Sequence, residues 1–153
     1  HIAYAGGDLF LAAQARPQGA RNVLEAAGLD FATPPVFGPW SEVWGRKAAR
    51  MLLAAAPDID AILCGSDHIA RGVLDGVKRT GRSVPDDVAV MGHDNWEILA
   101  AESEPPLTTI DMNLREVGRL AAQLIFKGLD EEEEIVVGEH KVPGRVVLRE
   151  STH

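Results

Sequence analysis

The stretch from Asp60 to Glu97 constrains the fold more than any other part of the chain. It holds two short apolar runs, at residues 61–64 and 88–91, and a glycine follows each of them. Between the runs, apolar residues recur at helical spacing, namely Ile69, Val73 and Val77. Two strands joined by a single helix must run parallel, and their connection is right-handed. We therefore predict a βαβ unit whose two strands end at the same edge of a sheet.

Polar residues follow both of these strands. Ser66 and Asp67 come after the first strand, and His93, Asp94 and Asn95 come after the second. Ligands of open parallel sheets bind just outside the carboxyl ends of the strands. This edge is therefore the place where we expect a binding site.

The alternation of strand and helix extends over most of the chain. We predict further strands at residues 2–5, 36–37 and 107–110, and further helices at 17–28, 41–57 and 113–128. Pro17 suits a first helical turn, so we expect the first helix to open near it. The fold class that follows is α/β, with a doubly wound, mostly parallel sheet and helices on both faces.

Apolar spacing also predicts which helix faces point inward. In the first helix the expected inward residues are Ala20, Val23, Leu24 and Ala27. In the second they are Val43, Trp44, Ala48, Met51, Leu52 and Ala55. Near the carboxyl end we expect residues 135–142 and 146–148 to form a strand pair, and the acidic run at 130–134 to be a solvated turn.

Composition excludes several classes of protein. The 153 residues carry a net charge of −8, whereas a protein surface that grips a nucleic-acid backbone is basic. No apolar run approaches the ~20 residues needed to cross a bilayer. The single cysteine, Cys64, sits in an apolar strand, so we expect no disulfide framework and a reducing compartment. Because the chain enters a strand directly after His1, we expect it to be a fragment.

The predicted strand ends offer a set of side chains suited to a small polar ring. These are Asp8, Trp40, Asp67 and Asp94, with Arg16 near the start of the first helix. Carboxylates and a guanidinium bond to vicinal hydroxyls, while an indole covers the apolar face of a sugar or base. Structural alternatives stand beside this interpretation. Asp67 is also a typical helix N-cap, Trp40 a typical packed surface anchor, and Arg16 a partner for a nearby acid.

Enzyme chemistry has little support in the sequence. Ser66, Asp67 and His68 are adjacent, so they point in different directions and cannot form a proton relay. The chain has no glycine fingerprint for a dinucleotide, no phosphate loop and no paired His or Cys spacing for zinc. We therefore expect no catalytic activity, no cofactor and no metal.

Short motifs over nearly the whole chain carry a resemblance to a known family. They are Gly38-Pro39-Trp40, residues 61–70 (AILCGSDHIA), 84–95 (VPDDVAVMGHDN), 106–110 (PLTTI) and 148–152 (LREST). In this order and spacing they resemble the effector-binding domain of lactose-repressor/galactose-repressor (LacI/GalR) transcriptional regulators. The resemblance implies a type I periplasmic-binding-protein-like fold of two lobes with the effector between them. It also implies a helix-turn-helix for operator DNA, upstream of this chain.

The resemblance also implies which residues contact the effector. Arg16 falls on the arginine that holds effector hydroxyls or a carboxylate, Trp40 on the stacking aromatic, and Asp94 on the aspartate after the second strand. Phe10 falls in the ligand loop. Ser66 takes the place where some members have a contacting asparagine, and His93 replaces the usual aromatic beside the aspartate. With Asp67, these residues form our candidate ligand-binding set: Phe10, Arg16, Trp40, Ser66, Asp67 and Asp94.

The family pattern further predicts how the chain is divided. Residues 1–106 would form the second, effector-binding lobe, and residues 107–153 the crossover strand, helix and terminal strands that link back to the absent first lobe. Without that lobe we expect the apolar stripe of the last helix to fold back over the sheet or to pair with a second copy. That stripe comprises Leu114, Val117, Ala121, Leu124, Ile125 and Phe126.

The functional hypothesis is a sugar-sensing domain of a cytoplasmic, homodimeric regulator. Its partners would be a small-molecule effector and, through the absent domain, operator DNA, with no membrane. One alternative is a periplasmic sugar-binding component of a transporter with the same fold, and a less favoured one is an α/β enzyme. The Arg149-Glu150-Ser151-Thr152 ending favours the regulator over the transporter component.

Overall fold

The computed structural model describes residues 1–8, 10–129 and 137–153, and its centre is a four-stranded parallel sheet. The strand order is β2 (Val36–Phe37), β1 (Ile2–Gly6), β3 (Ala61–Cys64) and β4 (Ala89–Met91). All three strand pairs are parallel, and Ala5 faces Val36 on one side and Cys64 on the other. The short β2 is an edge strand, as the prolines before it predict.

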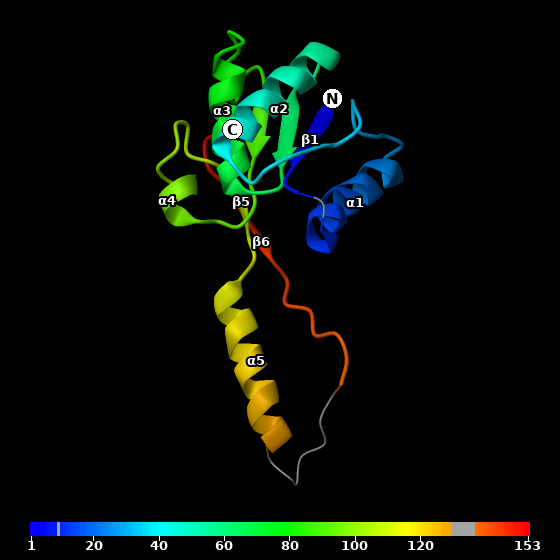
Figure 1. Ribbon diagram of the computed structural model, residues 1–153, viewed down its shortest axis with the longest axis vertical. Helices are drawn as coiled ribbons and strands as arrows, with labels where there is room; N and C mark the ends of the chain where they lie inside the picture. Colours follow the sequence, from blue (N-terminus) through cyan, green and yellow to red (C-terminus); the bar gives the residue numbers. More distant parts are fainter. Residues whose placement is uncertain (9, 130–136) are drawn as a thin grey trace.

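Helices cover both faces of this sheet (Figure 1). The chain steps from β1 to β2 in one direction and from β2 to β3 to β4 in the other. Right-handed crossovers therefore place α1 (Leu11–Ala26) on one face, and α2 (Glu42–Ala55) and α3 (Asp67–Lys78) together on the other. The predicted fold class, a doubly wound and mostly parallel α/β sheet, is confirmed.

Side-chain alternation along the strands divides the core into two clusters. Ala3 and Ala5 of β1 and Ile62 of β3 point toward α2 and α3, where they join the larger cluster. Tyr4 and Leu63 point the other way, toward α1, with Tyr4 in the smaller cluster and Leu63 packed against it. The predicted inward residues of α3 are all fully buried, namely Ile69, Val73 and Val77. Each contributes roughly 1.5–3 kcal/mol by burial.

The carboxyl-terminal segment leaves the lobe and returns to it. Thr108 extends the main sheet through a parallel bridge to Met91, and β5 (Thr109–Asp111) then pairs antiparallel with β6 (Arg145–Val147). Between them α5 (Leu114–Leu129) projects away from the sheet (Figure 1), and none of its described residues is buried. After β6 the chain returns to the sheet, where Ser151 is fully buried. Both ends of the segment thus pack on the lobe, and the boundary proposed between residues 106 and 107 stays a prediction.

The prediction for the start of α1 was wrong. The helix begins at Leu11 and not near Pro17, which lies inside it and is buried. Phe10 has extended backbone and serves as the N-cap, and Gln14 N donates to its carbonyl. The proline costs one internal hydrogen bond, because it has no N–H to donate. Residues 11–16, which precede the predicted start, are therefore helical.

Parts of the predicted inward stripes were also wrong. In α1, Leu24 is buried, but Val23 is 71% exposed and Ala27 is exposed beyond the helix end. In α2, Trp44, Ala48 and Leu52 are buried as predicted, whereas Val43, Met51 and Ala55 are exposed. The buried face of α2 is rotated toward α3, which packs beside it, and so Gly45, Ala49 and Leu53 are buried instead.

The predicted terminal strand pair was wrong as well. β6 pairs with β5, and residues 137–142 contain no strand. An ion pair of 3.0 Å between Arg145 and Asp111 joins the facing ends of β5 and β6. The acidic run at 130–134 lies outside the described residues, as do residues 135–136. The fold-back of the last helix over the sheet is also contradicted, because α5 stands clear of it (Figure 1).

Candidate functional site

Four of the predicted ligand residues meet at the carboxyl edge of the sheet. Phe10 precedes α1, Arg16 lies in its second turn, Trp40 follows β2 and Asp94 follows β4. Parallel strands bring these otherwise distant segments to one edge. The structure therefore brings these four side chains together, and their contact with a ligand stays a prediction.

Arg16 is the centre of this group. Its guanidinium donates a hydrogen bond to the carbonyl of Gly65, at the end of β3. It also lies 3.7 Å from the carboxylate of Asp94 and 5.7 Å from the centre of the Trp40 ring. About a quarter of the Arg16 side chain is exposed. The guanidinium is thus held in place while part of it still faces solvent.

Trp40 and Phe10 form an aromatic pair beside Arg16. Their ring centres are 5.5 Å apart, at an angle of 34°. The Trp40 ring lies directly on Gly7, where a Cβ atom would come within 2.1 Å of it, so only glycine fits there. The indole N–H of Trp40 is buried and has no hydrogen-bond partner among the described residues. Such a donor is typical of a group that bonds to water or to a ligand.

Asp94 supplies the acidic part of the site. Its carboxylate is hydrogen-bonded to His93 Nδ1 at 2.9 Å, and its side chain is 20% exposed. Its backbone has φ = 110°, in the left-handed region that residues with a side chain rarely adopt. The backbone N–H donates to the carbonyl of Ile110 at 2.9 Å. The carboxylate is therefore fixed on one side by His93 and faces Arg16 on the other.

Ser66 and Asp67 lie at the same edge but have internal partners. Ser66 is the N-cap of α3, and its hydroxyl accepts from the N–H of Ile69 at 3.2 Å. Asp67 is 1% exposed and accepts from Trp96 N at 2.8 Å and Thr109 Oγ1 at 2.6 Å. Burial raises the pKa of the Asp67 carboxyl, although both hydrogen bonds oppose the shift. Ligand contact by these two side chains stays a prediction, and the geometry gives each of them a structural role.

Cys64 and His68 each pack against neighbouring groups of the fold. Cys64 is buried in β3, and burial raises the pKa of its thiol, which leaves it protonated and inert. His68 packs against Trp96, with ring centres 5.9 Å apart. Within residues 1–8, 10–129 and 137–153, no three His, Cys, Asp or Glu side chains cluster in a way that could hold a metal ion.

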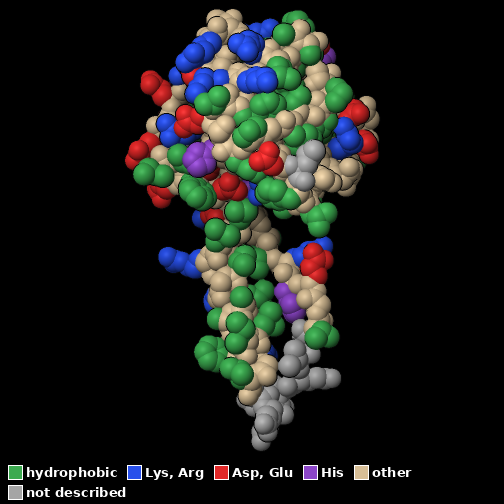
Figure 2. Space-filling model, viewed as in Figure 1, with side chains coloured by type: hydrophobic (Ala, Val, Ile, Leu, Met, Phe, Trp, Pro, Cys, Tyr) green, Lys and Arg blue, Asp and Glu red, His purple; other side chains and the backbone are tan. Residues whose placement is uncertain are grey.

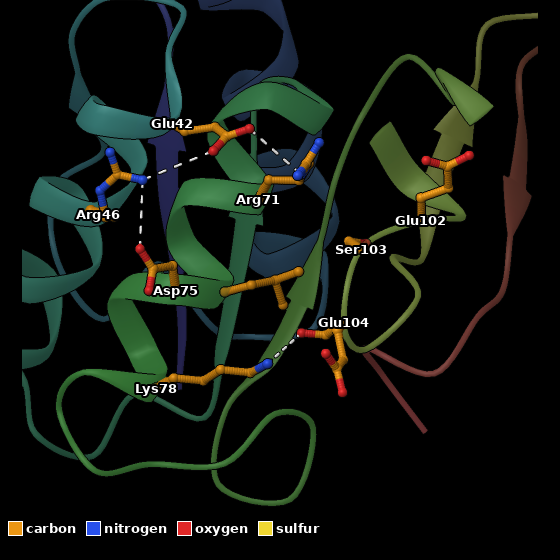
Figure 3. Close-up of a pocket in the computed structure, with 9 residues that line it drawn as sticks. Glu42, Arg46, Arg71, Asp75, Lys78, Glu102, Ser103 and Glu104 are labelled. Carbon is orange, nitrogen blue, oxygen red and sulfur yellow. Dashed lines mark hydrogen bonds and ion pairs between the residues drawn. The ribbon is translucent and has the colours of Figure 1, made fainter. Parts of the chain in front are cut away.

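A hollow of about 330 Å³ lies between α2, α3 and residues 102–104 (Figure 3). Its charged side chains largely satisfy one another. The ion pairs are Glu42 with Arg46 at 3.9 Å, Glu42 with Arg71 at 3.5 Å and Arg46 with Asp75 at 3.5 Å, and Lys78 bonds to the carbonyl of Glu104. A polar ligand would have to compete with these pairs, so we place the candidate site at the strand ends.

Another hollow, largely apolar and of about 440 Å³, adjoins the strand-end site. It runs between α1 and the sheet and is lined by Tyr4, Gly19, Leu63 and Met91, with Arg16 and His93 also on its wall. The Tyr4 hydroxyl is buried without a partner among the described residues, and burial raises its pKa to about 12. The phenol is therefore neutral, and it stands as a donor close to the Arg16 group.

Sequence reasoning missed two residues that support the site. Thr109 bonds to Asp67, and Arg149 donates to Asn95 Oδ1 at 3.0 Å and to the carbonyl of Leu107 at 2.8 Å. Both come from the carboxyl-terminal segment, 42 and 54 residues from the partners they reach. No local pattern reports such distant pairs. Their only signal in the sequence was that they fall within the family motifs at 106–110 and 148–152.

Comparison with known proteins places this geometry in context. The model of the periplasmic binding protein-like domain matches residues 1–152. The HTH-type transcriptional regulator CelR of Thermobifida fusca is 35% identical over 145 residues, which is 94% of this chain and 40% of CelR. The chain therefore spans less than half the length of that relative.

Solved structures agree with the sequence comparison. A CelR–cellobiose complex is 34% identical with a TM-score of 0.82, covering 98% of this chain and 46% of that one. A LacI-family regulator from Arthrobacter sp. FB24 in complex with lactose is 30% identical with a TM-score of 0.82, covering 100% and 58%. The lac repressor dimer bound to operator and the anti-inducer ONPF is 25% identical with a TM-score of 0.85, covering 99% and 45%.

Proposed function

Because this chain belongs to the periplasmic binding protein-like domain family and matches the effector domains of LacI-family transcriptional regulators, we propose that it senses a small sugar for such a regulator. Sugar binding at the strand-end site would alter the affinity of the whole protein for operator DNA. The DNA contact would lie in a helix-turn-helix outside this chain, in keeping with the net charge of −8.

One observation carries the proposal, namely the convergence of Arg16, Asp94 and the Phe10–Trp40 pair at one edge. A guanidinium donates to sugar hydroxyls, and a carboxylate accepts from them. An aromatic pair covers the apolar face of a pyranose ring. The unpartnered N–H of Trp40 adds a donor for one more ligand oxygen. Together these groups suit a neutral, hydroxyl-rich ring or pair of rings.

The remaining parts of the proposal concern the whole protein. We propose a cytoplasmic homodimer, in which residues 1–106 form the effector lobe and residues 107–153 link back to a first lobe. We also propose that the chain is not an enzyme, since its named relatives are transcriptional regulators. Among the described residues, no helix has the length and apolar character needed to cross a membrane.

The test is the affinity of the Asp94→Ala variant for sugars. Cellobiose and lactose, the ligands of two structural neighbours, are titrated into wild type and variant by calorimetry. Losing a charged hydrogen bond costs about 1.5–3 kcal/mol, so the variant should bind roughly 10- to 150-fold more weakly. Asp86→Ala, which removes an exposed carboxylate just before β4, at the opposite edge, should bind like wild type. Equal affinity in wild type and Asp94→Ala would refute the site.

A further inference from the structure

Two consecutive residues after β4 have unusual backbone angles. Asp94 has φ = 110° and Asn95 has φ = 53°, and neither is a glycine. Side chains disfavour this region, so such residues persist only where the surrounding structure holds them. Because Asp94 is also the acidic group of the proposed sugar site, the contacts that hold this turn decide where its carboxylate lies.

Residues 94–96 form the turn that follows β4. Each of its three backbone N–H groups donates a hydrogen bond to a group outside the turn. The bonds run from Asp94 N to Ile110 O at 2.9 Å, from Asn95 N to Thr109 Oγ1 at 3.4 Å, and from Trp96 N to Asp67 Oδ2 at 2.8 Å. Two of the acceptors belong to β5, and the third is the buried carboxylate at the start of α3. The turn is therefore fixed between the crossover strand and α3.

Asp67 joins these two supports. Its second oxygen accepts from Thr109 Oγ1 at 2.6 Å, so one carboxylate bonds to both the turn and the crossover strand. The end of β4 approaches this carboxylate so closely that a Cβ atom on Gly92 would lie 2.3 Å from Asp67 Oδ1. A fully buried carboxylate in a space this tight has little room to move.

The carboxyl-terminal segment adds a third support. Arg149 bonds to the side chain of Asn95 and to the carbonyl of Leu107, which is also fully buried. Thr108 and Ser151 secure the same region, since Ser151 Oγ accepts from Thr108 N at 2.8 Å and donates to Val90 O at 2.6 Å. The strained turn thus depends on both segments that join the lobe to the projecting α5.

We propose that Asp67 is a positioning residue that acts through Thr109 to couple the location of the Asp94 carboxylate to the crossover segment 107–111. A displacement of that segment would move Asp94 relative to Arg16, and sugar bound to Asp94 would in turn favour one position of the segment. The sugar part of this inference rests on the proposed function. The coupling itself rests only on the hydrogen bonds described above.

Thr109 is the best position for a test, because its hydroxyl is the link between the turn and the crossover. Thr109→Val keeps the size of the side chain and removes the hydroxyl. Thr109→Ser keeps the hydroxyl and removes a methyl group. Ser103→Ala is a matched control, since it deletes another buried hydroxyl whose bonds, to Ala100 O and Pro105 O, do not reach the turn.

The first readout is amide hydrogen exchange in the full chain, followed by NMR, and it needs no ligand. In Thr109→Val we expect the N–H groups of Asn95 and Trp96 to exchange at least tenfold faster than in wild type, while the amide of Val73 in the middle of α3 is unchanged. Thr109→Ser and Ser103→Ala should both retain wild-type exchange at the turn. Unchanged exchange in Thr109→Val, or equally fast exchange in Thr109→Ser, would overturn the positioning role.

The second readout is the calorimetric affinity for cellobiose and lactose. For whichever sugar wild type binds, Thr109→Val should bind about tenfold more weakly, Thr109→Ser should restore most of the affinity, and Ser103→Ala should match wild type. Wild-type affinity in Thr109→Val would overturn the coupling to the site. If wild type binds neither sugar at concentrations on the order of tens of millimolar, which a single lobe requires because it buries only part of a ligand, the proposed sugar class fails. The exchange measurement still decides the positioning role.

Discussion

At the scale of single residues, Asp67 shows that an acidic residue after a strand end can either contact a ligand or support the fold. A carboxylate at the start of a helix that follows a parallel strand is typical of both an N-cap and a ligand contact. Here the cap is Ser66, and the Asp67 carboxylate is fully buried and bonded to Trp96 N and Thr109 Oγ1. Asp94, at the end of the next strand, keeps a fifth of its side chain exposed and faces Arg16. Burial thus separates the supporting acid, Asp67, from the proposed binding acid, Asp94.

The raised pKa of Asp67 gives a prediction for stability against pH. Burial raises the folded-state pKa above its ordinary value of 3.8, so the folded state takes up a proton at a higher pH than the unfolded state does. The stability this provides is present in full below the unfolded pKa and is lost as pH rises through the folded pKa. Relative to Asp67→Asn, wild type should therefore gain free energy of unfolding as the pH falls from neutral toward about 4.

Urea denaturation of both proteins at several pH values provides the measurement. Because every other ionisable group is shared, their contributions cancel to first order in the difference between wild type and Asp67→Asn. A difference that does not change with pH, or one that moves against wild type on acidification, would show that the folded-state pKa of Asp67 is not raised.

At the scale of elements, periodicity predicted those parts that are determined locally. The βαβ unit at 60–97 and the buried stripe of α3 follow from apolar spacing, because Ile69, Val73 and Val77 belong to the core cluster that joins α3 to the sheet. The α2 stripe was only partly predicted, since α3 packs beside it and changes which residues are buried. The pairing of β6 with β5 was missed because an antiparallel partner 34 residues away leaves no periodic signal between Asp111 and Arg145.

The same distinction holds for the candidate site. The proximity of Trp40 and Asp94 could be predicted, because both follow strands whose ends a parallel sheet brings to one edge. That Arg16 joins them was implied only by the family resemblance, since Arg16 lies inside α1. The network of Asp67, Thr109 and Arg149 could not, since it depends on how the carboxyl-terminal segment returns to the lobe. Residue types alone do not specify that path.

At the scale of the whole molecule, the projecting helix α5 is the most unusual feature. Hydrophobic side chains line it (Figure 2), and Leu114, Ile125 and Leu129 are 59%, 64% and 74% exposed. Apolar patches of this kind mark interfaces in soluble proteins. The lobe does not cover the helix, so we expect the stripe to pair with a second copy, since symmetric pairing is the commonest form of self-association.

Sedimentation of the chain at micromolar concentration tests this expectation. Wild type should self-associate, and Ile125→Asp should be monomeric with an unchanged free energy of unfolding, because the side chain it replaces is already exposed. Gln123→Asp adds the same charge on another face of α5 and should associate like wild type. A wild-type chain that is already monomeric would mean that the stripe does not drive self-association.

The central claim is that a sugar binds at the strand-end site, and the indole N–H of Trp40 reports on it most directly. The chain has three tryptophans, so its ¹H–¹⁵N spectrum contains three indole signals. A single lobe buries only part of a ligand, so cellobiose and lactose are added to on the order of tens of millimolar. We predict that the Trp40 indole signal and the Asp94 amide shift together and saturably, while the indole of Trp96 does not move and Asp94→Ala abolishes the response. No shift at Trp40 with either sugar, or shifts confined to other parts of the chain, would contradict the account.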